Sequence, residues 1–251
     1  MLLTTVRDSV LIITMDRVAK RNAVDKALAA AIDAALARLD DDPDLRVGVL
    51  TGGTTVFSAG TDLHEPTSPA TPDGGEYGVI RRARRKPLIA AVEGFALGGG
   101  FEIVLACDLV VAGRSARFGL PEVARGVIAS CGALFRAHER LSPTVAMELL
   151  LTGDSIDAAR AHALGLVNSV VEDGSAVDTA VALGLRIARH SPAAIAATLR
   201  GAREARDALE DSGWSATGRA AAEAAASPDR AEGIAAFFER RAPRWKGLGR
   251  S

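Results

Sequence analysis

Short, uninterrupted apolar runs, separated by a segment with helical spacing, constrain the fold of this chain more than any other feature. Residues 10–14, 46–51 and 88–92 read as buried strands. Residues 25–39 carry apolar side chains at helical spacing and begin with Asp25, a favourable residue at a helix N-terminus. Strands that alternate with helices in this way predict an α/β core.

The rest of the chain continues this pattern and then becomes mainly helical. Glycines 98–100 open a predicted helix that runs to residue 107, and strands are expected at 108–112 and 167–171. Residues 66–75, with three prolines and two glycines, predict a flexible loop, and residues 76–85 predict a short basic helix. Further helices are expected at 142–151, 155–163, 175–189, 192–209 and 229–241.

The composition excludes several classes of protein. With 251 residues, 48% of them apolar, the chain can bury a full core, and a net charge of −1 gives no general attraction to nucleic acid or to an anionic membrane. We find no signal-peptide pattern and no run near the ~20 apolar residues of a membrane span. Cys107 and Cys131 lie among small or apolar residues, which fits a reducing compartment, so we expect a cytoplasmic protein. The four histidines lack metal-ligand spacing, so we expect no metal site.

Two loops of small residues suggest more than packing. Residues 57–63 read Phe-Ser-Ala-Gly-Thr-Asp-Leu, and residues 98–102 read Gly-Gly-Gly-Phe-Glu at the start of a predicted helix. Small residues let backbone N–H groups approach a ligand, and the free N–H groups of a helix N-terminus favour negative charge. Together the loops can offer two N–H donors to one carbonyl oxygen, which makes an oxyanion hole. A tight turn would explain either loop taken alone.

In this order the two loops resemble the paired signature of the crotonase superfamily, the enoyl-CoA hydratase/isomerase superfamily. Other matches lie along nearly the whole chain, and several ordered motifs are a more specific signal than any one of them. These matches are Arg17–Ala23, Cys107-Asp108, Phe118–Glu122, Leu151–Gly153, Ala163–Val167 and Phe237–Arg241.

The resemblance implies a fold, an assembly and a set of binding residues. The fold is α/β, a spiral of ββα repeats over residues 1–190 followed by a helical C-terminal trimerisation region over residues 191–251. We therefore expect a homotrimer or a dimer of trimers that binds an acyl-CoA thioester and uses no cofactor, because CoA is part of the substrate. The N–H groups that match the family's oxyanion hole belong to Thr61 and Gly99. The residues that match its CoA-binding positions are Lys20, Arg21, Ala23, Ala59, Gly60, Asp62, Leu63, Gly98, Phe238 and Lys246.

Two glutamates favour hydration over isomerisation. Adding water to a trans-2-enoyl thioester requires a base for the water and a proton for C2, and two carboxyl groups can supply both. Hydratases of the family use two glutamates, and this chain has Glu102 and Glu122 at the matching positions. We assign Glu102 to water activation and Glu122 to protonation of C2. Taken alone, Glu102 also reads as a charge that complements a helix N-terminus, and Glu122 as a surface residue.

Several features leave alternatives open. Residues 127–133 depart from the family pattern in a segment that borders the acyl pocket in the family, so the departure bears on the substrate more than on the chemistry. The basic residues of segment 81–86 either attract the phosphates of CoA or form a solvated helix face. Cys131 reads as a small buried cysteine. The alternative functions are a Δ3,Δ2-enoyl-CoA isomerase, another crotonase reaction such as thioester hydrolysis, and a silent acyl-CoA-binding protein. A serine hydrolase would require a Ser–His–acid set, and we find no nucleophile motif for one.

Overall fold

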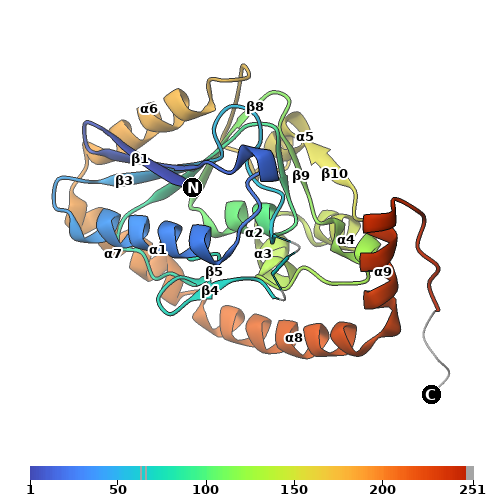
Figure 1. The fold of residues 1–251 in the computed structure, drawn as a ribbon. Coiled ribbons are helices and arrows are strands. Elements are labelled where there is room, and N and C mark those ends of the chain that lie inside the picture. The colour runs from blue at the N-terminus through green and yellow to red at the C-terminus, as the bar shows by residue number, and fades with distance from the viewer. Residues whose placement is uncertain (63, 66, 247–251) are drawn as a thin grey trace.

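A six-stranded sheet forms the centre of the computed structural model, which describes residues 1–62, 64–65 and 67–246 (Figure 1). Its strand order is β1-β2-β3-β6-β8-β11. The first two strands are antiparallel, and each later pair of neighbours is parallel. The strands are β1 Leu2–Arg7, β2 Val10–Met15, β3 Val47–Thr51, β6 Leu88–Val92, β8 Leu109–Gly113 and β11 Ser169–Val171. Apart from β1, which the sequence did not indicate, these are the predicted strands.

A second, three-stranded sheet carries the site. Its order is β10-β9-β7, made of β10 (Ser155–Asp157), β9 (Arg117–Gly119) and β7 (Phe95–Leu97). The chain enters the large sheet with β6, crosses to the small sheet with β7 and then forms helix α2, Gly99–Ala106. It repeats the first two steps with β8 and β9, followed by the 3-10 helix η2, Pro121–Arg125. This is the expected spiral of ββα turns.

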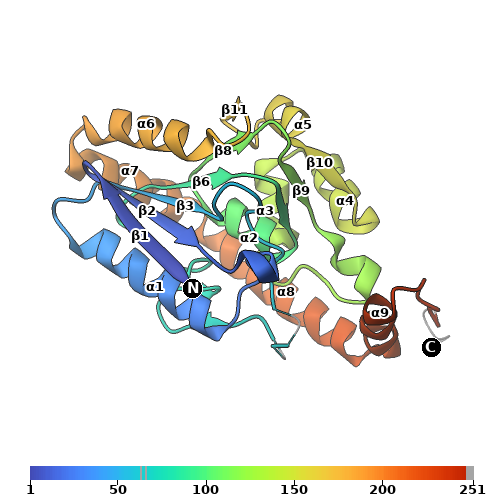
Figure 2. The ribbon, with the colours of Figure 1, turned by 45° about the horizontal axis from the view of Figure 1, so that its top comes forward.

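Alternating side chains of the large sheet face two separate hydrophobic cores. Leu11 and Ile13 of β2 point into the larger core, which also contains residues of α1 (Lys26–Asp41) and α2. Val10 and Ile12 of the same strand point to the opposite face, where α6 (Ala176–Ala188) packs. Figure 2 shows α6 on one side of the sheet and α1 and α2 on the other. Because both faces are covered, these parallel strands are apolar throughout rather than alternating.

The C-terminal helices form an arm that packs against the rest of the chain. In Figure 1 helix α8 (Asp207–Ala226) crosses beneath α3 (Ala133–Arg140) and the hairpin of β4 (Ala70–Thr71) and β5 (Gly75–Glu76). It leads to α9 (Pro228–Glu239) at the right. Arg136 of α3 donates two hydrogen bonds to Glu210 of α8, and the Phe135 and Trp214 rings lie 5.1 Å apart. The arm comprises α7 Pro192–Glu204, α8 Asp207–Ala226 and α9 Pro228–Glu239. The remaining elements are η1 Val18–Lys20, β4 Ala70–Thr71, β5 Gly75–Glu76, α3 Ala133–Arg140, α4 Pro143–Thr152 and α5 Ala158–Ala163.

The predicted helix at 76–85 is wrong, because the backbone there turns repeatedly. Gly75, Tyr77 and Gly78 have φ angles of 63°, 57° and 75°, which a right-handed helix cannot accommodate. Within the loop predicted at 66–75, β4 (Ala70–Thr71) pairs with β5 (Gly75–Glu76) as a short hairpin.

Two other helix predictions need correction at their boundaries. Residues 155–163 contain β10 followed by α5, which begins where the Asp157 side chain accepts a hydrogen bond from the Arg160 N–H. The predicted helix at 192–209 is broken between Glu204 and Asp207, so that α7 and α8 are separate. Among the described residues, no helix combines the length and the apolar character needed to span a membrane.

Candidate active site

The two glycine-containing loops lie against each other at the N-terminus of α2. The Ser58 N–H donates to Phe95 O (3.2 Å), and the Leu97 N–H donates back to Ser58 O (3.0 Å). Gly60 has a φ of 88°, and a Cβ atom placed on it would lie 2.7 Å from the Gly99 nitrogen. The contact between the loops therefore requires glycine at residue 60, both for its backbone angle and for space.

Two backbone N–H groups at this contact remain available to a ligand. The Gly98 N–H donates to Gly119 O (2.9 Å), and the Asp62 N–H donates to Val24 O (3.0 Å). Within residues 1–62, 64–65 and 67–246, no acceptor receives a hydrogen bond from the Thr61 or Gly99 N–H. The Gly99 N–H lies in the first turn of α2, where the helix dipole favours negative charge. This arrangement can stabilise an oxyanion.

Glu102 is a buried carboxyl group one turn into α2. The residue is 2% exposed, and its Oε1 accepts hydrogen bonds from the Cys131 N–H (2.7 Å) and the Ala133 N–H (3.1 Å). Burial raises the pKa of Glu102 to about 7, although these two N–H donors oppose the shift. The carboxyl can thus exchange a proton near neutral pH.

Glu122 supplies the second carboxyl group from η2. Its Oε2 is buried and has no hydrogen-bond partner in the described part of the chain. Its Oε1 lies 3.0 Å from the position that a Cβ on Gly98 would occupy, so the carboxyl faces the second loop. Burial, and then the nearby charge of Glu102, raise the pKa of Glu122 to about 8. Both carboxyls therefore keep their protons to a higher pH than an exposed glutamate does.

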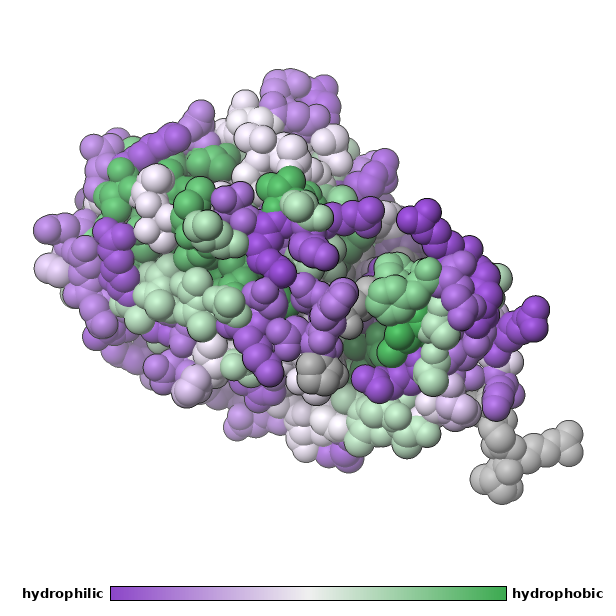
Figure 3. All heavy atoms as spheres, viewed as in Figure 1, coloured by the Kyte–Doolittle hydropathy of each residue, from purple (hydrophilic) through white to green (hydrophobic). Residues whose placement is uncertain are grey.

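A cavity of about 210 Å³ opens beside Glu122. Its wall includes the apolar side chains of Leu120 and Leu134, and Met147 from α4. Ile128, from the segment that departs from the family pattern, also lines it. Figure 3 shows hydrophobic residues gathered in a hollow toward the side of α4 and α9. The site therefore combines two available N–H donors, two proton-holding carboxyls and an apolar cavity.

Comparison with known proteins identifies the family. The family model described as enoyl-CoA hydratase/isomerase matches residues 5–248. The chain belongs to this family. Its relatives in the family include hydratases and dehydratases that act on CoA thioesters, as their names state.

Several relatives match over nearly their whole length. The 2,3-dehydroadipyl-CoA hydratase of Escherichia coli is 37% identical, covering 98% of this chain and 98% of that protein. An enoyl-CoA hydratase of Mycobacterium tuberculosis is 39% identical, over 96% of this chain and 94% of that protein. The crystal structure of carnitinyl-CoA hydratase from Mycobacterium avium is 42% identical, with a TM-score of 0.93 and 98% of both chains covered. The expected crotonase fold is confirmed.

Five of the ten residues matched to the CoA-binding positions of the family lie in or beside the two loops. Ala59, Gly60 and Gly98 belong to the loops around the available N–H groups. Lys20 and Arg21 are exposed on an adjacent turn, which is tied to these loops because the Ala59 N–H donates to Arg21 O (3.0 Å).

Three more matched residues are Ala23, Asp62 and Leu63, of which the structure describes the first two. Ala23 is half-buried at the end of the exposed turn. A hydrogen bond from the His64 N–H, and then the ion pair with Arg17, hold the pKa of Asp62 below its ordinary value, so Asp62 is already engaged. Leu63 lies outside the described residues.

The C-terminal candidates lie on a segment that packs against η2 of the same chain. Phe238 is 58% exposed on α9. The Lys246 N–H donates to Asp229 Oδ1 (2.9 Å) at the start of that helix. The Arg125 guanidinium of η2 lies 4.5 Å from the Phe237 ring centroid. Both candidates are therefore linked to the Glu122 segment through α9.

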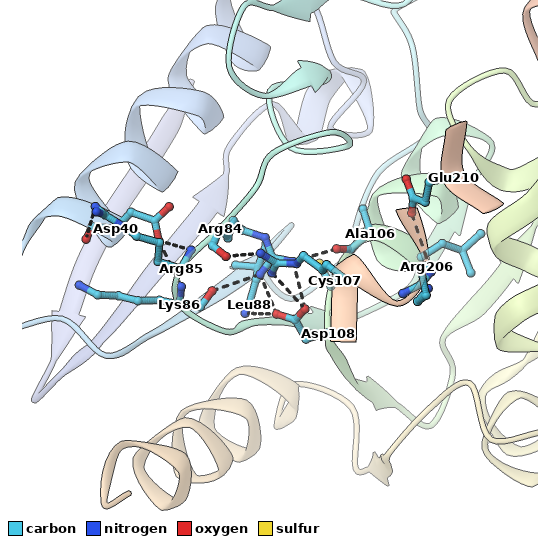
Figure 4. A network of polar contacts seen from close by, with 12 residues as sticks. Asp40, Arg84, Arg85, Lys86, Leu88, Ala106, Cys107, Asp108, Arg206 and Glu210 are labelled. Carbon is cyan, nitrogen blue, oxygen red and sulfur yellow. Dashed lines mark hydrogen bonds and ion pairs between the residues drawn. The ribbon is translucent and has the colours of Figure 1, made fainter. Parts of the chain in front are cut away.

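The basic segment 81–86 does not form a helix face, and its residues Arg84 and Lys86 are bound within the fold (Figure 4). An attraction of this segment for the phosphates of CoA stays a prediction. Arg84 is 4% exposed and donates to Asp108 Oδ2 (2.6 Å). The Lys86 ammonium donates to Leu39 O (2.7 Å) and Asp42 O (2.6 Å). These groups hold strands and helices together, and a sequence pattern alone does not distinguish such cations from solvated ones.

Tyr77 is the residue of the site that sequence reasoning missed. It is 1% exposed, and its hydroxyl contacts Thr61 Oγ1 at 2.8 Å and Cys131 Sγ at 3.4 Å. It is the only tyrosine of the chain, but it lies in a segment expected to be a surface helix. Cys131 itself is 1% exposed, as expected for a small buried cysteine.

Proposed function

We propose that this chain is an enoyl-CoA hydratase that adds water across the double bond of a trans-2-enoyl-CoA to give the 3-hydroxyacyl-CoA. The observation that carries the proposal is the two carboxyls with raised pKa values, Glu102 and Glu122, together with two backbone N–H groups that have no acceptor among the described residues. Hydratases and dehydratases among the relatives support this class of reaction.

In the proposed mechanism the thioester oxygen lies between the Thr61 and Gly99 N–H groups. As water attacks C3, negative charge moves to this oxygen, where the two donors stabilise it. Glu102 accepts a proton from the attacking water, and Glu122 donates its own proton to C2. The new C3–O and C2–H bonds complete the hydration. The raised pKa of Glu122 suits an acid that must hold its proton at neutral pH.

The test is hydration of a short trans-2-enoyl-CoA by the purified protein, followed by loss of the conjugated thioester's ultraviolet absorbance. We expect rapid loss in the wild type, and a decrease of kcat by about 100-fold or more in both Glu102→Gln and Glu122→Gln. The matched control is Glu93→Gln, because Glu93 is also buried and accepts two backbone hydrogen bonds, from Gly174 and Ala176. Its kcat should stay within about twofold of the wild type.

Other outcomes would identify the alternative functions. Migration of the double bond of a trans-3-enoyl-CoA without hydration would replace the proposal with an isomerase. Acyl-CoA binding without turnover of short, long or branched substrates would replace it with a silent binding protein. Release of free CoA would indicate thioester hydrolysis.

We also propose that the chain assembles as a homotrimer or a dimer of trimers. Large apolar side chains are exposed on its C-terminal half, among them Leu151, Phe238 and Trp245. Such groups are commonly covered in an assembly. Light scattering of the purified protein at micromolar concentration should give three or six times the chain mass, and a monomer would contradict this.

A further inference from the structure

Tyr77 occupies a backbone conformation that is unusual for an aromatic residue. Its φ is 57°, in the left-handed region that favours glycine. The position is held firmly, because the Tyr77 N–H donates to Pro69 O (2.7 Å). The following Gly78 leaves no room for a side chain, since a Cβ atom there would lie 2.2 Å from Ala29 O of α1. A strained residue that the surrounding fold holds in place is a candidate for a role in function.

The Tyr77 hydroxyl joins three segments of the chain. It lies 2.8 Å from Thr61 Oγ1 and 3.2 Å from Ser68 Oγ, and these two hydroxyls are themselves 3.2 Å apart. The Cys131 thiol, 3.4 Å away, donates to the same oxygen. Burial, and then the nearby Cys131 and Glu102, raise the pKa of Tyr77 well above its ordinary value, so the phenol remains a hydrogen-bond donor.

The phenol ring also lies directly against Gly99. A Cβ atom placed on Gly99 would be 2.2 Å from the Tyr77 hydroxyl oxygen and 2.5 Å from Cζ. Tyr77 therefore lies against both residues whose N–H groups have no acceptor among the described residues: Thr61 through the hydroxyl, and Gly99 through the hydroxyl and the adjoining edge of the ring.

We propose that Tyr77 is a positioning residue that sets the separation and direction of the Thr61 and Gly99 N–H groups, an inference that rests on the proposed function of these donors. Donors that stabilise a transition state act only when they are held in the required geometry, and displacements well below 1 Å reduce their effect. The Thr61 hydroxyl is the link between the phenol and the first loop. Loss of the phenol hydroxyl should therefore weaken stabilisation of the transition state more than it weakens binding of the substrate.

The first test is Tyr77→Phe, which keeps the ring against Gly99 and removes the hydroxyl. We expect kcat for a short enoyl-CoA to decrease at least tenfold, while KM changes less than threefold. Thr61→Val removes the other end of the same hydrogen bond and should give a similar loss. The double variant should be little worse than either single variant, because the two substitutions break one interaction. Thr217→Val is the matched control, since Thr217 is a hydroxyl residue on α8 that is 3% exposed, and its kcat should remain at the wild-type value.

A second test reports on the oxyanion hole without turnover. The absorbance band of a bound cinnamoyl-CoA moves to longer wavelength when N–H donors polarise its carbonyl, and we expect Tyr77→Phe to lose at least half of the wild-type shift. Full kcat and a full shift in this variant would overturn the inference, as would an increase in KM alone. If Tyr77→Phe does not fold, Thr61→Val decides by the same criteria. If the wild-type protein shifts the band of the probe but hydrates no enoyl-CoA, the hydratase proposal is rejected, and the spectral test still decides the role of Tyr77. If the wild-type protein does not shift the band, the role proposed for Tyr77 is overturned.

Discussion

At the scale of single residues, burial controls the protons of the Glu102–Glu122 pair. The folded protein holds the proton of Glu122 up to a pKa of about 8, whereas its ordinary pKa is 4.5. A pKa that is raised on folding contributes stability below about pH 4.5, and this contribution is lost as the pH rises toward about 8. Glutamine at residue 122 cannot ionise, so Glu122→Gln does not lose this stability as the pH rises. Its melting temperature should exceed that of the wild type by about 5 °C at pH 8 and by less at pH 5. Calorimetry from pH 5 to pH 8 measures this.

The control for the effect of Glu122 is a glutamate on the surface. Glu148 pairs with Arg160 at 2.7 Å, and both side chains are almost half exposed. Glu148→Gln should change the melting temperature by little and by the same amount at each pH. A difference for Glu122→Gln that is constant across this range would contradict the assignment of a buried, protonated carboxyl.

At the scale of elements, a buried ion pair joins the large sheet to α7. Asp108 pairs with Arg84 and accepts the Leu88 N–H (2.8 Å; Figure 4). Arg203 of α7 donates to Arg84 O. Removing one partner of a buried pair leaves a charge without compensation, at a typical cost of about 3 to 5 kcal/mol. Asp108→Asn should therefore lower the free energy of unfolding by about 3 kcal/mol, measured by urea denaturation.

An exposed ion pair of the same type provides the comparison. Asp41 pairs with Arg85 at 2.8 Å, with 77% and 65% of their side chains exposed. Asp41→Asn should cost less than about 1 kcal/mol. Equal losses for Asp108→Asn and Asp41→Asn would show that the buried pair contributes no more than a surface pair.

At the scale of the whole molecule, the C-terminal arm supports the segment that carries Glu122. A Cβ atom on Gly233 of α9 would lie 2.3 Å from the carbonyl of Arg125, and one on Gly126 would lie 2.4 Å from Asp229 O. The two backbones therefore touch through glycines. Gly233→Ala should push α9 away from η2, displace Glu122 and lower kcat/KM by about tenfold or more in the absorbance assay.

A second glycine in the same arm tests whether any change from glycine to alanine there lowers kcat/KM. A Cβ atom on Gly218 of α8 meets no described atom within 4 Å, so Gly218→Ala should leave kcat/KM unchanged and raise stability by up to about 1 kcal/mol through helix propensity. Equal activity in Gly233→Ala and Gly218→Ala would mean that the arm does not hold Glu122 in place.

The predictions from sequence succeeded where the signal was local. The apolar strand at 88–92 and the helix after Asp25 are confirmed, since they depend on side chains close together in the chain. The strands β7, β9 and β10 were missed because three residues are too few for a pattern. The helix predicted at 76–85 was wrong, because helical spacing did not indicate the left-handed angles of Tyr77 and its neighbours. The boundary between residues 190 and 191, and the roles of the site residues, remain predictions.

The sequence by itself determined the α/β class and the family, and through the family resemblance it implied the spiral fold, because these depend on ordered motifs along the chain. It also indicated which residues could carry acid–base chemistry. Only the tertiary structure decided that Glu122 keeps a buried oxygen with no partner in the described part of the chain, that Arg84 and Lys86 are tied into the fold, and that Tyr77 contacts Thr61 and Gly99. The physical reason is that burial, proton affinity and hydrogen-bond partners arise from groups that are distant in sequence and meet only when the chain has folded.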